Sequence, residues 1–209
     1  MRVAIFGATG RTGRHLVRQA LERGYEVVAF ARDPGRLGVS HERLVVVGGD
    51  VLDAAAVDGA VDGCDAVISA LGHARGAPKD VQTRGTQNIV RAMKEHGVRR
   101  IVSLTGAGVR AEGDEPKLVD RVFAFLLRVF QKDVLEDAAN HVDVVRGSRL
   151  EWVIVRGPRL TEGEKTGDYR VGLVGKNSGT RISRPDLAGF MLDQLASDAH
   201  LRSMPLVSY

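Results

Sequence analysis

Short apolar runs alternate with amphipathic stretches along most of the chain. Residues 3–6 form an apolar run that is short and compatible with a β-strand. The next stretch, residues 14–23, places its apolar side chains on one face at helical spacing. Repetition of this strand-then-helix pattern is typical of α/β proteins, in which helices connect parallel strands.

The pattern predicts six main strands, at residues 3–6, 25–31, 44–51, 65–72, 100–108 and 150–159. Helices are expected at residues 14–23, 86–94 and 134–147, and from residues 53 and 183 onward. We interpret the chain as one Rossmann-type domain over residues 1–209: a doubly wound, mostly parallel sheet with helices on both faces, and a substrate site formed by the C-terminal loops.

Three further segments carry weaker signals. Residues 116–130 are apolar over more than one helical stripe, which predicts a helix buried in the core, against a partner or along a substrate pocket. Residues 161–180 are polar and contain glycine, which favours a loop and a hairpin over the active-site edge. Residues 205–209 are expected to add a final edge strand.

Length and composition narrow the class of protein. A chain of 209 residues can bury a sizeable core without metals, and its single cysteine excludes an internal disulfide. No apolar stretch reaches the roughly 20 residues that span a bilayer, and the chain opens on a strand rather than a secretory signal. We therefore expect a cytoplasmic protein without membrane contact, as a monomer or weak homodimer.

The distribution of charge and ligand-type residues excludes two further classes of partner. The formal net charge is +4, but acidic and basic residues alternate throughout, which favours small anions over nucleic acid. No group of histidines and cysteines has the spacing of metal ligands, so no metal is expected.

A glycine-rich turn follows the first strand without a break. It runs from Gly7 through Thr9, Gly10, Arg11 and Thr12 to Gly13. Glycine adopts backbone angles closed to other residues and lets a ligand approach the backbone, and the N-terminus of the next helix favours an anion. The alternative is a tight connection that merely needs glycine, but its position at the first strand of an alternating chain favours a pyrophosphate site.

Arg32 falls at the tip of the second predicted strand, where dinucleotide-binding folds contact the adenosine ribose. An acidic residue there accepts the 2′-hydroxyl of NAD, whereas an arginine pairs with the 2′-phosphate of NADP. Arg36 can complete a charge-assisted clamp with Arg32. Asp33 argues the other way, and both arginines could be solvated surface residues. We expect NADP(H) to be preferred over NAD(H).

Other candidates follow the ends of the remaining strands. Asp50 and Val51 would lie beside the adenine, unless Asp50 only ends its strand in a turn. Leu71 and Gly72 close the fourth strand where a cofactor backbone can approach. Thr105 is the first hydroxyl at the end of the fifth strand, and a bond to its own turn is the alternative.

Basic residues are expected at the same edge of the sheet. Arg75, Arg156 and Arg159 follow or end predicted strands there, which suits an anionic substrate. For Arg75, and for His73 in the same loop, a solvated surface position is the alternative.

Together, the glycine turn at residues 7–13, the strand tip at residues 31–33 and the segments at 47–51, 70–72 and 85–88 resemble the atypical short-chain dehydrogenase/reductases. The chain is most similar to the NmrA-like NAD(P)H-binding group and to the biliverdin-IXβ reductases (flavin reductases), from end to end. The resemblance implies that NADP is bound by Gly7, Thr9, Gly10, Arg11, Thr12, Arg32, Arg36, Asp50, Val51, Leu71 and Gly72.

The sequence departs from the family in its catalytic groups. Most short-chain reductases use a Tyr-x-x-x-Lys pair, in which the lysine lowers the tyrosine pKa. Neither Tyr25 nor Tyr169 has a lysine four residues later, and Tyr209 ends the given sequence. The flavin-reductase pattern has a serine at Gly106 and a histidine at Arg159, so Thr105 and Arg159 are the nearest catalytic candidates.

These features favour an NADPH-dependent oxidoreductase that transfers a hydride to a planar, anionic acceptor such as a flavin, a quinone or a tetrapyrrole-like molecule. Such a transfer depends mainly on positioning, since solvent can supply the proton. One alternative is a regulatory protein that senses NADP(H) without turnover. Another is a sugar epimerase or dehydratase, which the missing tyrosine disfavours.

Overall fold

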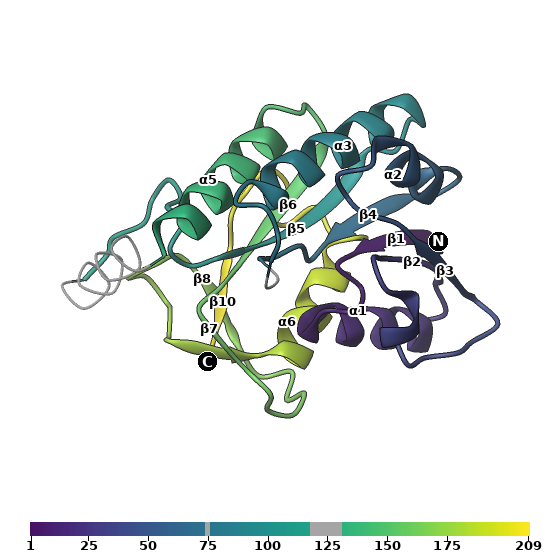
Figure 1. The fold of residues 1–209 in the computed structure, drawn as a ribbon. Helices are drawn as coiled ribbons and strands as arrows, with labels where there is room; N and C mark the ends of the chain where they lie inside the picture. The colour runs from purple at the N-terminus through teal and green to yellow at the C-terminus, as the bar shows by residue number, and fades with distance from the viewer. Residues whose placement is uncertain (74–75, 118–130) are drawn as a thin grey trace.

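Eight strands form the central sheet of the computed structural model, which describes residues 1–73, 76–117 and 131–209 (Figure 1). Their spatial order is β3-β2-β1-β4-β5-β6-β10-β8. In that order the strands are β3 (Leu44–Gly48), β2 (Glu26–Ala31), β1 (Arg2–Phe6), β4 (Ala66–Ser69), β5 (Arg100–Gly106), β6 (Glu151–Gly157), β10 (Leu206–Ser208) and β8 (Arg170–Gly172). Only β8 runs antiparallel to its neighbour. The doubly wound, mostly parallel fold expected from the sequence is confirmed.

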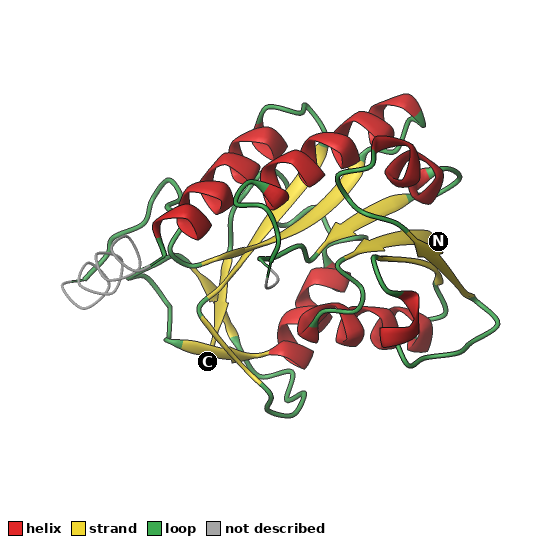
Figure 2. Ribbon diagram, viewed as in Figure 1, coloured by secondary structure: helices red, strands yellow, loops and turns green. Residues whose placement is uncertain are grey.

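Helices cover both faces of this sheet (Figure 2). One face carries α2 (Ala54–Val61), α3 (Val81–Glu95) and α5 (Lys132–Arg146), and the other carries α1 (Arg11–Glu22) and α6 (Arg184–Asp193). A short 3₁₀ turn, η1 (Pro34–Arg36), follows β2, and a separate two-stranded sheet pairs β7 (Arg159–Thr161) with β9 (Arg181–Ser183). The predicted helix at residues 116–130 lies almost entirely outside the described residues.

The strands have near-continuous apolar sequences because both of their faces are buried. In β1, Ala4 and Phe6 pack toward α2, α3 and α5, whereas Val3 and Ile5 pack toward α1 and α6. Successive side chains point to opposite faces of a strand, so alternate residues of β1 contribute to different cores. The two cores fix the register of β1 against β2 and β4, and with it the edge where the strands end.

One prediction about the C-terminal part of the chain holds only in part, and another was wrong. Within residues 161–180 an antiparallel bridge joins Leu173 to Lys176, but the strands of this segment have distant partners: β7 pairs with β9, and β8 pairs with β10. The last strand, β10, is not at the edge of the sheet but lies between β6 and β8. Strands of three residues carry too little periodicity to specify a partner, so distant contacts decide their pairing.

The order of the strands reverses direction at β1. From β1 the chain moves outward to β2 and β3, and then returns to β4 on the other side of β1. In such sheets a crevice opens outside the carboxyl ends of the strands at the point of reversal, and ligands bind there.

Candidate functional site

A cavity of about 450 Å³ occupies this crevice. Residues from the ends of β1, β2 and β4 line it, together with residues after β3 and residues of the C-terminal half. Among them are eleven of the residues predicted to bind the cofactor: Gly7, Thr9, Gly10, Arg11, Thr12, Arg32, Arg36, Asp50, Val51, Leu71 and Gly72. The fold thus brings together these eleven residues from four separate segments of the sequence.

The glycine turn has the geometry of a close-approach site. Gly7 has a positive φ of 76°, and a Cβ atom there would lie 2.5 Å from the carbonyl oxygen of Ala70. Gly10 caps α1 without a side-chain hydrogen bond, so no capping side chain occupies the first turn of the helix. Free N–H groups and the helix dipole favour an anion at such a position.

Gly13 does not line the cavity. A Cβ atom at this position would lie 2.1 Å from the carbonyl oxygen of Gly7, because α1 packs directly on the turn. Its place in the pattern is therefore explained by helix packing, as for the third glycine of dinucleotide-binding turns.

Arg32 and Arg36 lie on the wall of the cavity at the tip of β2 and in η1. The backbone of η1 is held in place because Arg14 Nη2 donates a hydrogen bond of 2.7 Å to the carbonyl oxygen of Arg36. Within residues 1–73, 76–117 and 131–209, neither Arg32 nor Arg36 forms an ion pair. Both exposed guanidinium groups are available for a phosphate.

Asp50 and Val51 follow β3 along the same wall. The backbone N–H of Leu52 donates to Asp50 Oδ1 at 2.9 Å, which is the turn interaction weighed as the alternative for this aspartate. Asn88 Nδ2 donates to the carbonyl oxygen of Val51 at 2.9 Å and ties this segment to α3. Asp50 therefore shapes a turn and borders the cavity at once.

Leu160, Arg184 and His73 are among the cavity residues that the sequence analysis did not predict as binding residues. Arg184 begins α6, its side chain is 8% exposed, and its Nη1 lies 2.7 Å from Glu162 Oε1. Burial lowers the pKa of Arg184, while the charge of Glu162 opposes this shift. Its position at the start of the last predicted helix did not identify it as a cavity residue, because its contact with Glu162 depends on the pairing of β7 with β9.

His73 follows β4 and is held by α5. Its Nε2 lies 2.9 Å from Asp137 Oδ2, although the N–H direction is not aligned as in an ideal hydrogen bond. The His73 side chain is 17% exposed, and that of Asp137 is 2% exposed. The solvated-loop alternative for His73 is therefore wrong, since an ion pair with a buried carboxylate fixes the imidazole beside the cavity.

Thr105 and Arg159 are not among the residues that line the cavity. Thr105, at the end of β5, is buried and shares its side of the strand with Ile101 and Ser103, toward α5. Arg159 is exposed in β7, opposite Arg181. Their catalytic role stays a prediction.

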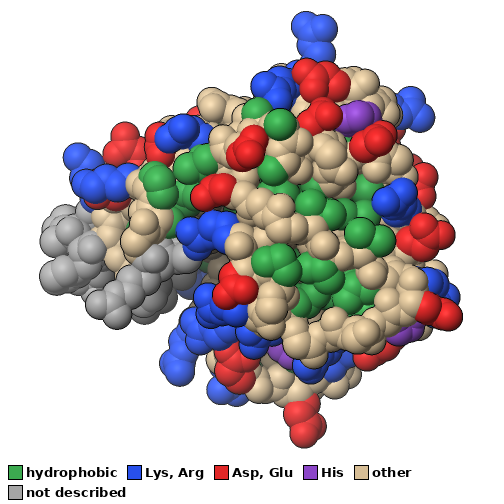
Figure 3. Space-filling view, turned by 45° about the vertical axis from the view of Figure 1, so that its right-hand side comes forward, with side chains coloured by type: hydrophobic (Ala, Val, Ile, Leu, Met, Phe, Trp, Pro, Cys, Tyr) green, Lys and Arg blue, Asp and Glu red, His purple; other side chains and the backbone are tan. Residues whose placement is uncertain are grey.

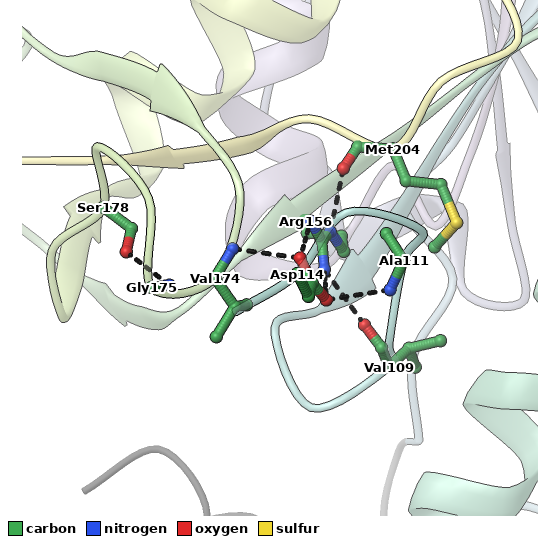
Figure 4. Close-up of polar contacts among 8 residues, drawn as sticks. All are labelled: Val109, Ala111, Asp114, Arg156, Val174, Gly175, Ser178 and Met204. Atoms are coloured by element: carbon green, nitrogen blue, oxygen red, sulfur yellow. Dashed lines mark hydrogen bonds and ion pairs between the residues drawn. The ribbon is translucent and has the colours of Figure 1, made fainter. Parts of the chain in front are cut away.

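Arg156 was predicted to face an anionic substrate, and this is wrong. Its side chain is fully buried, and its guanidinium forms two hydrogen bonds with the carboxylate of Asp114, at 2.7 and 2.9 Å (Figure 4). The Nε of Arg156 also donates to the carbonyl oxygen of Met204 at 2.9 Å. Each of the three side-chain nitrogens of Arg156 donates within the fold. Arg75 lies outside the described residues.

Another buried polar pair lies between the sheet and α5. Ser103 Oγ is 3.3 Å from Nε2 of His141, whose side chain is 2% exposed. Burial lowers the pKa of His141 to about 4, so its imidazole is neutral at physiological pH. A neutral, enclosed imidazole of this kind completes the packing rather than attracting an anion.

One face of the surface carries acidic and basic side chains interspersed, with hydrophobic side chains between them (Figure 3). Among the described residues, no group of three or more potential metal ligands occurs and no helix is long and apolar enough to cross a membrane.

The strand order, the glycine turn and the crevice define a Rossmann-type dinucleotide-binding protein. Comparison with known proteins gives the family: the chain belongs to the NAD(P)H-binding family, whose model matches residues 7–198. The resemblance to atypical short-chain dehydrogenase/reductases of the NmrA-like group is confirmed.

A curated relative, the uncharacterized protein YwnB of Bacillus subtilis (strain 168), is 26% identical over 212 residues. The alignment covers 96% of this chain and 94% of that protein. Several further curated relatives match only about half of this chain and about a third of their own length or less.

Solved structures share the complete fold. A short-chain dehydrogenase/reductase from Veillonella parvula DSM 2008 in complex with NADP is 20% identical, with a TM-score of 0.83 over 100% of this chain and 94% of that one. ChuY, an anaerobillin reductase from Escherichia coli O157:H7, is 19% identical, with a TM-score of 0.81 over 100% of this chain and 97% of that one. At these identities the likeness shows the fold.

Proposed function

We propose that the protein is an NADPH-dependent reductase that transfers a hydride to a planar, anionic acceptor of the flavin, quinone or tetrapyrrole type. The observation that carries this proposal is the cavity wall, on which the glycine turn and the Arg32/Arg36 pair are combined. When bound there, NADPH supplies a hydride with its electron pair. The complex of the Veillonella parvula protein with NADP supports the same use of this fold.

Different residues on the cavity wall suit different parts of the cofactor. The uncapped first turn of α1 and the close approach at Gly7 suit the pyrophosphate. Arg32 and Arg36 suit the 2′-phosphate of NADP, because each can donate charge-assisted hydrogen bonds that NADH cannot accept. We infer that NADP(H) is preferred for this reason.

We assign to Arg184 the role that the sequence analysis predicted for Arg156, which is to attract an anionic substrate. Arg184 lines the cavity together with Leu104 and Leu160, and its Nη1 donates a hydrogen bond of 3.4 Å to the carbonyl oxygen of Leu160. Apolar side chains beside one guanidinium suit a planar acceptor that carries an acidic group. Arg159 and Thr105 remain candidates only for contacts made after an acceptor has bound.

The experiment is anaerobic oxidation of NADPH by a panel of flavins, quinones and tetrapyrroles, followed through the absorbance of the reduced nicotinamide. We expect at least one acceptor to oxidise NADPH faster with the protein than without it. Arg184→Met should raise the apparent KM for anionic acceptors and leave kcat largely unchanged, because uniform binding is lost. Arg91→Met, at an exposed position of α3 that does not line the cavity, serves as the matched control.

Failure of every acceptor would contradict the reductase. NADP(H)-dependent capture of a protein partner would then favour the sensing alternative.

A further inference from the structure

Among the described residues that line the cavity, His73 has a role neither in binding the cofactor nor in attracting an anionic acceptor, and its imidazole lies against the carboxylate of Asp137. His73 comes from the loop after β4, and Asp137 from the second turn of α5, 64 positions later in the sequence. Their contact therefore exists only in the folded protein. His73 also lines the cavity that we assign to NADPH and its acceptor.

Asp137 is held rigidly. Its carboxylate accepts hydrogen bonds of 2.9 Å from the backbone N–H groups of Gln82 and Thr83, and it also accepts one from the hydroxyl of Thr83. These bonds fix both oxygens against the start of α3.

The contact with Asp137 determines how the imidazole can act. Nε2 of His73 is buried next to the carboxylate, while the side chain as a whole retains 17% exposure. The exposed part of the ring therefore excludes Nε2, and Nδ1 is left as the nitrogen that can exchange a proton with a ligand. In the neutral ring, a proton on Nε2 faces the carboxylate of Asp137, which favours this tautomer and leaves Nδ1 for the ligand.

Other charges near the pair are at the surface. Asp133, one turn before Asp137 on α5, interacts electrostatically with His73. Lys79 lies 2.6 Å from Asp133 and largely compensates its charge. Asp137 is thus the buried charge that acts on His73.

We propose that His73 is the proton donor of the reaction and that Asp137 is its positioning residue; this assignment rests on the proposed reductase function. The His73 imidazolium gives its proton to the acceptor heteroatom that becomes negative as the hydride and its electron pair arrive from NADPH. The imidazole then recovers a proton from water. NADP⁺ and the doubly reduced, protonated acceptor are the products.

Acceptors differ in their need for this proton. A quinone accepts the electron pair on a carbonyl oxygen, which must be protonated to give the hydroquinone. A flavin accepts the hydride at N5 and can leave as the anionic hydroquinone at neutral pH. Menadione (2-methyl-1,4-naphthoquinone) and FMN therefore separate proton donation from cofactor binding and positioning.

The test compares the native protein with His73→Gln, using both acceptors over a range of pH. General acid catalysis contributes about 10²- to 10⁴-fold, so kcat for menadione should fall by roughly 100-fold or more, while kcat for FMN should change only a few-fold. The native kcat for menadione should decrease as rising pH removes the imidazolium proton, and this decrease should be absent in the variant. The Kd for NADPH, measured by calorimetry, should be unchanged.

The matched control is His96→Gln. His96 is also paired with carboxylates, at 3.0 Å from Asp58 and 3.3 Å from Asp62, but it is not among the cavity residues. This substitution should leave both acceptors and the pH profile unaffected.

Nitrogen-15 NMR of histidine-labelled protein without cofactor gives a readout independent of activity. The resonances that are lost in His73→Gln identify His73. Its neutral form should carry the proton on Nε2, and the opposite tautomer would overturn the assignment. Equal loss for menadione and FMN would overturn it too, and would leave the reductase standing. Failure of the native protein with both acceptors, and with the whole panel, would overturn both proposals.

Discussion

We expect two side chains, Arg32 and Arg36, to determine which of the two nicotinamide cofactors binds more tightly. Their guanidinium groups lie on the cavity wall and form no ion pair within the described parts of the chain. Asp33, which the sequence offered as counter-evidence, lines the same cavity. Substitution of Arg32 therefore distinguishes a preference for NADPH, which Arg32 and Arg36 favour, from a preference for NADH, which Asp33 favours.

Arg32→Ala should weaken NADPH binding by roughly 10- to 100-fold, because a hydrogen bond to a charged group contributes about 1.5–3 kcal/mol. Binding of NADH should change little, since it lacks the 2′-phosphate. Calorimetric titration with both cofactors measures the difference, with Arg91→Ala on α3 as the control. Equal weakening of NADPH and NADH would show that Arg32 does not contact the 2′-phosphate.

At the level of elements, Asp114 and Arg156 connect segments that the sequence keeps far apart. Arg156 belongs to β6 and Asp114 to the loop after β5. Asp114 also accepts hydrogen bonds from the backbone N–H groups of Ala111 and Val174, at 2.8 and 3.0 Å, so the turn after β8 is tied to the same carboxylate. One buried ion pair thus ties β6 to the loop after β5 and to the turn after β8.

Arg156→Met should lower the free energy of unfolding by about 3–5 kcal/mol, because it leaves the buried carboxylate of Asp114 without its partner. Urea denaturation measures this loss. The nearby pair of Lys176 and Glu115 is exposed, and Lys176→Met should cost less than about 1 kcal/mol. Similar losses in the two variants would contradict the structural role of the buried pair.

The same pair predicts how stability depends on pH. Burial alone would raise the pKa of Asp114, but hydrogen bonds from Arg156, Ala111 and Val174 outweigh it and lower the pKa. A depressed pKa in the folded state contributes stability above the ordinary aspartate pKa, and this contribution is lost as the pH falls through the folded-state value. The gap in stability between the native protein and Asp114→Asn should therefore narrow on acidification.

The elements show where sequence reasoning succeeds and where it stops. The parallel strands and the glycine turn could be predicted, because periodicity and backbone requirements are local. The pairing of β10 and the burial of Arg156 could not, since each depends on partners that only the folded chain brings near. His73 shows the same limit: its loop reads as solvated until Asp137 is placed beside it.

For the whole molecule, the two halves of the sheet provide different parts of the site. The N-terminal half contributes the glycine turn and the arginines at the tip of β2. The C-terminal half contributes Leu160 from β7 and Arg184 from α6, and α6 packs beside α1 (Figure 1). A ligand that fills the cavity must therefore contact both halves of the sheet. A cofactor and an acceptor that bind side by side require such an arrangement.

Hydride transfer within this cavity is the central claim. The most direct test is a single turnover measured under anaerobic conditions. It compares NADPH with NADPH that carries deuterium at the transferred position of C4. The protein is mixed with its best acceptor, and the decay of the reduced nicotinamide is recorded. The account predicts a decay faster than that of free NADPH with the same acceptor, and slower with deuterium because the C–H bond breaks in the measured step. A decay no faster than that of free NADPH would contradict it.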